Sequence, residues 1–256
     1  MNVGMNVGLN KTEKKVVSLL IEDSEYTSDE LAAKIKKEGS QDNHRNKKVG
    51  MKMCGRYYVD DDTAREIQKL IRQVDEKMRK TENIHLQAGD IHPSEVAPVI
   101  TADHNDLCCR WKRWGFPGFR GKQLIFNARS ESALEKKMFQ ESAAHRRVVV
   151  PAAGFYEWNK NKEKNIFYRE GQPILYMAGL YNRYQDEDRF VILTTAANES
   201  MRPVHDRMPL LLEQDEIEKW LLEDDLTEAL LQITPALLER RSDFEQMSLF
   251  PVENSQ

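Results

Sequence analysis

Apolar positions change their spacing several times after residue 55, and each spacing predicts a type of element. Between Asp60 and Lys80 they lie three or four residues apart, which predicts an amphipathic helix. Helical patterns also cover Ala128–Gln140 and Gln214–Leu222. Many short strands that do not alternate regularly with these helices indicate an α+β domain with a largely antiparallel, curved or closed sheet. The expected strands are Val96–Thr101, Leu107–Trp114, Leu124–Phe126, Arg147–Val150, Pro173–Tyr181, Arg189–Thr195 and Met208–Leu212.

The first fifty residues have a pattern of their own. Asn10 with Glu13 and Thr27 with Glu30 have the spacing of capping boxes, and each pair precedes a short apolar cluster, which predicts two helices. The polar segment 40–48 that follows has no apolar stripe, so the base-reading third helix of a helix-turn-helix unit is not expected. We expect a helical N-terminal extension and linker at 1–50, which the mature protein need not retain.

After the N-terminal extension, the chain is expected to form a main domain followed by a C-terminal tail. A main domain at 53–224 contains the predicted sheet, and a helical C-terminal tail occupies 225–256. Within this tail, helical patterns cover Leu226–Ile233 and Pro235–Arg241. A polar stretch interrupted by Met247, Leu249 and Phe250 follows them.

Composition and charge exclude several protein classes. Hydrophobic residues make up 40% of the 256 residues, but no run approaches the roughly 18 apolar residues of a membrane span. Three cysteines cannot form a disulfide framework, so a reducing, cytoplasmic location is expected. Lys and Arg outnumber Asp and Glu by 18 to 14 in residues 52–150, whereas residues 151–256 are strongly acidic. Any contact with DNA must therefore be local.

Four short motifs concentrate chemically useful side chains. They are Met53-Cys54-Gly55-Arg56, the segment Phe126–Glu131, the segment Pro151–Trp158 and the segment His205–Pro209. Each also has an ordinary structural interpretation. Cys54 fits a buried inert thiol, Asn127 fits a helix N-cap, and His205 fits a surface loop. Glu157 fits a paired buried acid, because an acid among aromatic residues is costly to bury unless it is paired or used.

These four motifs, in this order, resemble the SOS-response-associated peptidase (SRAP) family of abasic-site shielding proteins. The resemblance runs from Met53 to about Leu222. It implies an α+β fold with a barrel-like core and flanking helices. It also implies an enzyme of the SOS response and DNA repair that binds single-stranded DNA and forms a covalent crosslink with abasic sites.

The resemblance assigns a role to each motif. Cys54, as an N-terminal cysteine, would form a Schiff base with the sugar aldehyde through its amine and close a thiazolidine through its thiol. Glu157 would act as general acid and base, and its aromatic surroundings would raise its pKa. His205 would donate a proton to the opened sugar, and Asn127 would position cysteine and sugar. Phosphates or bases of the DNA would be held by Arg56, Arg129, Arg207, Trp114, Phe119 and Trp158.

Two positions depart from the family pattern. Here 53 residues precede Cys54, and its nitrogen is an amide for as long as Met53 remains attached. We therefore expect a working form that begins at Cys54, produced by initiation at Met53 with methionine removal or by self-cleavage, which would be a hydrolase activity of the peptidase type. The segment Gly89–Ser94 contains His92 where the family has an Asn-x-x-Pro segment, and His92 receives no role.

The tail contains a second resemblance. Gln246-Met-Ser-Leu-Phe250 is similar to the pentapeptide by which proteins bind the bacterial sliding clamp. Leu249 and Phe250 would enter an apolar groove of the clamp, while Gln246 would form hydrogen bonds. The alternative is that these apolar side chains pack against their own domain.

Two other functions stay open from the residues alone. A thiol peptidase acting on other proteins would use Cys54 as nucleophile, His205 as base and Asn127 as orienting group. A non-enzymatic DNA-binding regulator would depend on the N-terminal helices. The histidines show no metal-ligand spacing, and no glycine-rich phosphate loop is present, so no metal and no cofactor are expected. A monomer without membrane contact is expected.

Overall fold

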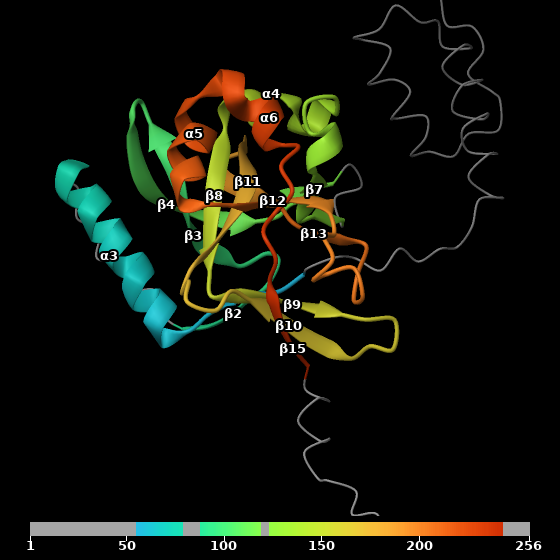
Figure 1. Ribbon diagram of the computed structural model, residues 1–256. Coiled ribbons are helices and arrows are strands. Elements are labelled where there is room, and N and C mark those ends of the chain that lie inside the picture. Colours follow the sequence, from blue (N-terminus) through green and yellow to red (C-terminus); the bar gives the residue numbers. More distant parts are fainter. Residues whose placement is uncertain (1–54, 79–87, 119–122, 243–256) are drawn as a thin grey trace, which may run out of the picture. The chain divides into compact units, whose positions relative to one another are not determined.

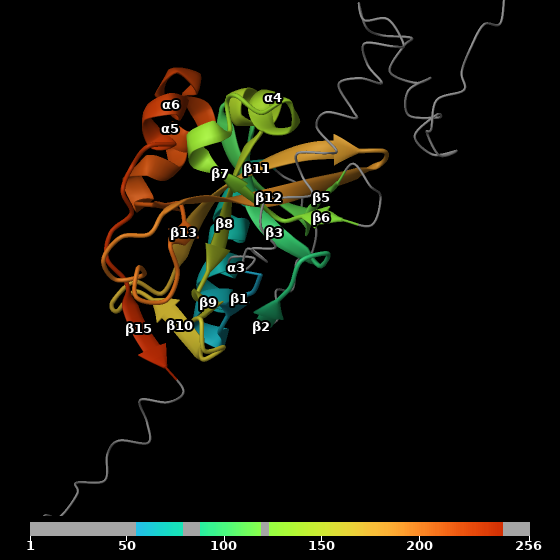
Figure 2. The same ribbon diagram turned by 90° about the vertical axis from the view of Figure 1, so that its right-hand side faces the viewer.

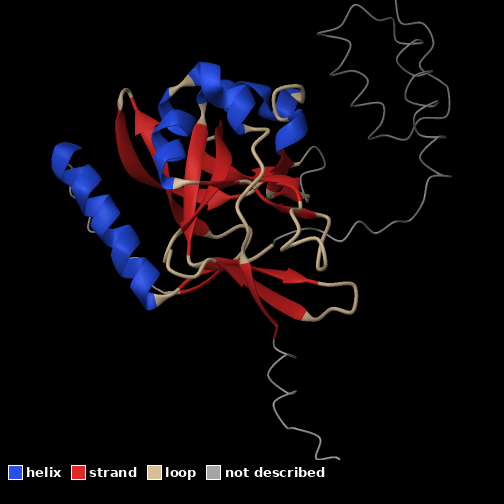
Figure 3. Cartoon of the chain, viewed as in Figure 1, coloured by secondary structure: helices blue, strands red, loops and turns tan. Residues whose placement is uncertain are grey.

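The computed structural model describes residues 55–78, 88–118 and 123–242, and Figure 1 shows their arrangement. Two β-structures lie next to each other, a closed barrel and a five-stranded sheet. The helices lie outside them, as the blue segments around the red strands in Figure 3 show. In the described part of the chain, no helix is both long and apolar enough to cross a membrane.

Five strands close the barrel. Pairing runs from β3 to β8, from β8 to β11, from β11 to β12, and from β12 through β4 back to β3. The β12–β4 pairing is parallel and the other four are antiparallel. Two-residue turns join β3 to β4 and β11 to β12, and His104 and Gln185 adopt positive φ there, as tight hairpins require. The barrel strands are β3 (Val96–Asp103), β4 (Asp106–Trp114), β8 (Arg147–Ala152), β11 (Leu175–Tyr184) and β12 (Glu187–Ala196).

Short strands extend the barrel. Strand β7 (Asn127–Arg129) pairs in parallel with β12, which also pairs with β13 (Arg207–Pro209). Strand β14 (Leu211–Leu212) pairs with β11. A separate two-stranded ribbon consists of β5 (Phe116–Pro117) and β6 (Leu124–Ile125). Because both β7 and β13 border β12, two of the four motifs lie along one barrel strand.

The five-stranded sheet has the order β15-β10-β9-β1-β2 and is antiparallel throughout. Figure 2 shows it below the barrel. Only Ala153 separates barrel strand β8 from β9, so the chain passes directly from the barrel into the sheet. The sheet strands are β1 (Tyr57–Val59), β2 (Gly89–Ile91), β9 (Gly154–Trp158), β10 (Lys164–Tyr168) and β15 (Glu239–Ser242).

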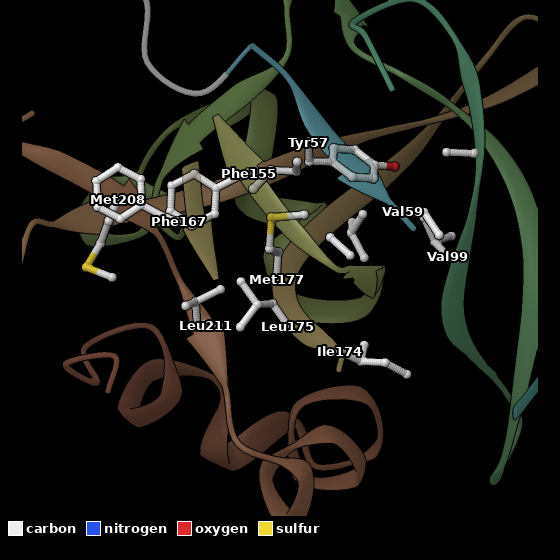
Figure 4. Close-up of a cluster of buried hydrophobic side chains, with 14 of the residues drawn as sticks. Tyr57, Val59, Val99, Phe155, Phe167, Ile174, Leu175, Met177, Met208 and Leu211 are labelled. Carbon is white, nitrogen blue, oxygen red and sulfur yellow. The ribbon is translucent and has the colours of Figure 1, made fainter. Parts of the chain in front are cut away.

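Two apolar cores stabilise this arrangement. One joins the sheet to the barrel and contains Tyr57, Phe155, Phe167 and Met208, which lie among the side chains drawn in Figure 4. Ala64 and Ile67 of α3 (Asp61–Met78) belong to the same core. The other core lies between the barrel and the helices α4 (Lys137–His145), α5 (Ile217–Leu222) and α6 (Thr227–Leu230). Burial of this apolar surface is the main favourable term in folding.

The fold class is confirmed, and several predicted elements are confirmed within a few residues of their ends. The expected helix at Ala128–Gln140 is wrong, because β7 and a 3-10 turn at Ser130–Ser132 precede a helix that begins at Lys137. The helix expected at Pro235–Arg241 is also wrong, because Glu239–Ser242 is added to the sheet as β15. Residues 1–50 and the clamp-like motif lie outside the described residues.

Candidate functional site

The segment that follows Cys54 enters the middle of the five-stranded sheet. The Tyr156 N–H donates to the Arg56 carbonyl at 3.0 Å, and Tyr57 pairs with Phe155. A Cβ atom added to Gly55 would lie 3.8 Å from the ring of Phe126. The fold therefore brings the residues after Cys54 next to both the Phe126–Glu131 motif and the Pro151–Trp158 motif. Cys54 and Phe119 themselves lie outside the described residues.

Glu157 lies on the inner face of this sheet and is 2% exposed. Successive side chains on a strand point to opposite faces, so Glu157 shares the face of the core residue Phe155. The Trp158 N–H donates to Glu157 Oε1 at 3.2 Å. A buried carboxylate is costly unless hydrogen bonds or charges compensate it, which marks this position as a functional candidate.

Asn165 of β10 lies directly opposite Glu157 in the sheet register and is 3% exposed. Its Nδ2 donates to the Glu163 carbonyl at 3.0 Å. Asn165 was not among the predicted site residues, because Lys164–Tyr168 was not predicted as a strand. No local signal marked Asn165, because it ends the polar segment 159–165.

Asn127 lies in β7 opposite Ile192, so it is a strand residue rather than a helix N-cap. The preceding carbonyl, that of Phe126, accepts hydrogen bonds from the Ile192 N–H at 3.1 Å and from Trp114 Nε1 at 2.8 Å. These bonds fix the backbone on which Asn127 is carried. Arg129 follows on the same strand, is exposed and pairs with Thr194.

His205 lies in the loop between β12 and β13, with its side chain 8% exposed. Its Nδ1 accepts a hydrogen bond from the Arg207 backbone N–H at 3.0 Å. The Asp206 carboxylate lies 3.1 Å from the same nitrogen, but its side chain is 89% exposed and solvated. Because the backbone amide is a fixed donor, the neutral imidazole carries its proton on Nε2. His205 is thereby prepared to donate from Nε2.

The His205 loop is anchored to the same core as Glu157. Met208 of β13 packs with Phe155 and Phe167, the inner-face residues of β9 and β10, and the three appear near one another in Figure 4. The Asn198 N–H donates to the Met208 sulfur, and the His205 N–H donates to the Met201 carbonyl. The loop that carries the last of the four motifs is therefore fixed against the core that β9 and β10 cover.

Arg207 is held by neighbouring groups of the protein. Its Nη2 donates to Glu131 Oε2 at 2.8 Å, its Nη1 donates to Glu131 Oε1, and Nη2 also reaches the Thr194 carbonyl. The hydrogen bond from Arg207 is the main reason that the pKa of Glu131 is lowered. A phosphate on Arg207 would therefore have to share or replace Glu131.

The predicted contact of Trp114 with DNA is wrong, because its side chain is completely buried and no base can stack on it. Its ring is nearly parallel to that of Phe190, with centroids 6.2 Å apart, and lies 5.2 Å from Tyr57. Lys112, two residues earlier, is also buried and pairs with Asp188 at 2.7 Å. Trp158 is different, because it is half-buried and lies on the outer face of the sheet beside Arg56.

The site consists of acids, amides, a histidine and arginines. Among the residues that the structure describes, no three His, Cys, Asp or Glu side chains form a group that could hold a metal ion. A buried carboxyl group is suited to proton transfer, and a histidine that donates from Nε2 is suited to hydrogen-bonding an oxygen of a ligand. The arginines and Trp158 are suited to binding an anionic, base-bearing chain.

Comparisons with known proteins agree with the motifs. A family model described as SOS response associated peptidase (SRAP) matches residues 53–255. The abasic site processing protein YedK of Escherichia coli is 33% identical over 120 residues, which are 43% of this chain and 54% of that protein. The abasic site processing protein YoaM of Bacillus subtilis is 28% identical over 183 residues, covering 66% of this chain and 79% of that protein.

Solved structures are similar in fold. A protein from Bacteroides thetaiotaomicron superposes with a TM-score of 0.61 and 25% identity, covering 76% of this chain and 95% of that one. A protein from Bordetella bronchiseptica gives a TM-score of 0.59 and 24% identity, covering 74% of this chain and 99% of that one.

Proposed function

The chain belongs to the SOS response associated peptidase (SRAP) family, and we propose that it processes abasic sites in single-stranded DNA by forming a covalent crosslink through Cys54. Relatives named as abasic site processing proteins support the substrate class. The observation that carries the proposal is the buried carboxylate of Glu157, on the strand that pairs with the residues following Cys54.

The chemistry follows from the two nucleophiles of an N-terminal cysteine. The open-chain form of an abasic sugar has an aldehyde. The α-amine adds to this carbonyl, and loss of water gives an imine. The thiol then adds to the imine carbon and closes a five-membered thiazolidine, with the thiol proton ending on nitrogen. No oxidant or metal takes part in these steps, and the crosslink would shield the lesion.

Proton transfer is the part that the described residues would supply. Ring opening and loss of water from the amine adduct both need an acid and a base at the reacting centre. Glu157 is assigned these transfers, and the Trp158 N–H, which donates to Glu157 Oε1, would help to hold its carboxylate in place. His205 would donate a hydrogen bond from Nε2 to the sugar oxygen, because its Nδ1 already accepts the Arg207 N–H.

The amine of Cys54 must be free for this reaction. The proposed working form therefore begins at Cys54, after methionine removal or self-cleavage behind Met53. Reversal of the crosslink or cleavage of the sugar–phosphate bond would give lyase activity. Asn127 is assigned to positioning the cysteine and the sugar.

DNA contacts are assigned according to exposure. Arg129 is exposed and Arg56 is about one-third exposed, so both can reach phosphates. Arg207 would contribute where a phosphate replaces Glu131. Contacts by Phe119, and sliding-clamp binding through Gln246, Leu249 and Phe250, stay predictions from the sequence.

The alternative is a thiol peptidase that acts on other proteins. In such an enzyme His205 would accept the proton of the Cys54 thiol. The neutral tautomer described above has its proton on Nε2 and its Nδ1 lone pair in the hydrogen bond from Arg207, so neither nitrogen is available as an acceptor. This hydrogen bond favours the crosslinking function.

A crosslinking assay tests the proposal. Protein that begins at Cys54 is incubated with single-stranded DNA containing one abasic site, and the covalent complex is measured on a denaturing gel. Cys54→Ala should abolish the stable crosslink. Cys54→Ala and Cys54→Ser both keep the α-amine and lose the thiol, so each should give only an imine that borohydride traps.

The matched controls block one reactant at a time. An acetylated N-terminus removes the nucleophilic amine, and DNA with a tetrahydrofuran lesion lacks the aldehyde, so neither should crosslink. A full crosslink by Cys54→Ala, or by the acetylated protein, would overturn the proposal.

A further inference from the structure

Three aromatic rings form a row on the outer face of the five-stranded sheet, opposite the core. Their centroids lie 5.2 Å apart between Tyr58 and Tyr156 and 6.4 Å apart between Tyr156 and Trp158. All three side chains are half-buried. We call Tyr58, Tyr156 and Trp158 the aromatic row.

Gly154 makes the first part of this row possible. A Cβ atom at this position would lie 2.8 Å from the Tyr58 hydroxyl oxygen and 2.4 Å from the Phe167 carbonyl oxygen. Any other residue would therefore displace the ring of Tyr58 from its place over β9. The sequence Gly-Phe-Tyr-Glu-Trp thus alternates between inner-face residues of the site and outer-face residues of the row.

Cations accompany the rings. The Arg56 guanidinium carbon lies 5.4 Å from the centroid of Trp158 and 5.9 Å from that of Tyr156. Lys164 Nζ lies 5.1 Å from the centroid of Tyr156. In the turn between β9 and β10, Lys160 and Lys162 are exposed. Positive charge therefore follows the row from the site to the tip of the hairpin.

An acidic residue, Asp90, holds part of this surface in place. Asp90 of β2 accepts a hydrogen bond from the Tyr156 hydroxyl at 2.8 Å and forms an ion pair with Arg56 at 3.4 Å. Burial, followed by this hydrogen bond, raises the pKa of Tyr156, so its hydroxyl stays a protonated donor. The ring and the guanidinium are thereby oriented before any ligand binds.

We propose that the aromatic row and its cations bind the nucleotides that flank the lesion, so that the single strand continues from the site along the outer face of β9. The proposal rests on the proposed function. The chemistry of the aromatic row indicates a single strand as its ligand, because alternating rings and cations match the bases and phosphates of such a strand. Arg56 and Trp158 are direct neighbours of Gly55 and Glu157, which connects the row to the site.

Binding of undamaged single-stranded DNA tests the row separately from the crosslinking chemistry. Fluorescence anisotropy with a labelled 12-nucleotide strand measures Kd. Tyr156→Ala should weaken binding about tenfold through lost stacking. Tyr156→Phe keeps the ring and should restore most of the affinity. Lys164→Ala should weaken binding and reduce the slope of log K against log salt by about one unit.

Lys219→Ala on α5 is the matched charge control, since Lys219 pairs with Asp215 away from the sheet, and it should bind like wild type. Circular dichroism shows whether each variant is folded. Wild-type Kd values for both Tyr156→Ala and Lys164→Ala would overturn the proposal. A wild-type protein that binds DNA through the row but never crosslinks an abasic site would instead overturn the proposed function.

Discussion

The barrel and the five-stranded sheet differ in where they place buried polar side chains. In the barrel, Lys112 and Arg147 are buried cations, and each pairs with a carboxylate that is partly exposed, that of Asp188 or Asp224. Arg147 also donates to the backbone carbonyls of Trp220 and Ala143. These polar groups connect barrel strands to neighbouring elements, and their partners explain their burial.

The sheet buries a carboxylate and an amide side by side on its inner face, at Glu157 and Asn165. An apolar pair in this register would pack against the same core without the cost of desolvating a carboxylate. Proteins accept such costs mainly at functional sites. The position of a buried polar group, rather than its burial alone, therefore separates structural from functional residues.

The largest expected effect concerns the two tryptophans, one from each region. Trp114→Ala should lower the free energy of unfolding by about 3–5 kcal/mol, because it leaves a cavity in the barrel core. Trp158→Ala should lower it by less than about 1 kcal/mol, because its ring lies on the outer face of the sheet. Urea unfolding measures both, and similar losses for the two variants would contradict the comparison.

An intermediate effect concerns two buried ionisable side chains, Glu157 of the sheet and Arg147 of the barrel. Glu157→Gln should slow crosslinking about 100-fold through loss of proton transfer. The amide keeps the size of the side chain, so the free energy of unfolding should change by less than about 1 kcal/mol.

Arg147→Met is the matched variant in the barrel and should show the opposite pattern. It removes several hydrogen bonds to helix ends and should cost about 2 kcal/mol of stability. Its crosslinking rate, measured per folded molecule, should stay at the wild-type value. A rate loss in Arg147→Met as large as that in Glu157→Gln would remove the distinction between the two regions.

The smallest effect concerns the ion pair between Arg207 and Glu131, on elements next to barrel strand β12. Arg207 lowers the pKa of Glu131, so this pair stabilises the fold fully above the ordinary carboxyl pKa. Its contribution is lost as the pH falls through the lowered pKa. Because the Glu131 side chain is 49% exposed, the contribution should stay below about 1 kcal/mol.

Glu131→Gln should therefore be slightly less stable than wild type at pH 7, and this difference should shrink toward pH 3. Urea midpoints measured at both values test this expectation. A difference of equal size at the two pH values would contradict an electrostatic origin.

The sequence by itself determined the features that depend on local patterns. The period of Asp61–Met78 predicted its helix, and the runs at Val96 and Leu107 predicted the strands of a hairpin, because burial of one face imposes a regular spacing. The four motifs were recognisable because each lies within a few consecutive residues.

Only the tertiary structure decided which neighbours these residues have. Trp114 and Trp158 look alike in the sequence, but strand pairing buries one and places the other on the outer face. Asn165 became a site residue only through its register opposite Glu157. Local spacing carries no information about such pairings, because they join strands whose positions along the chain are independent of one another.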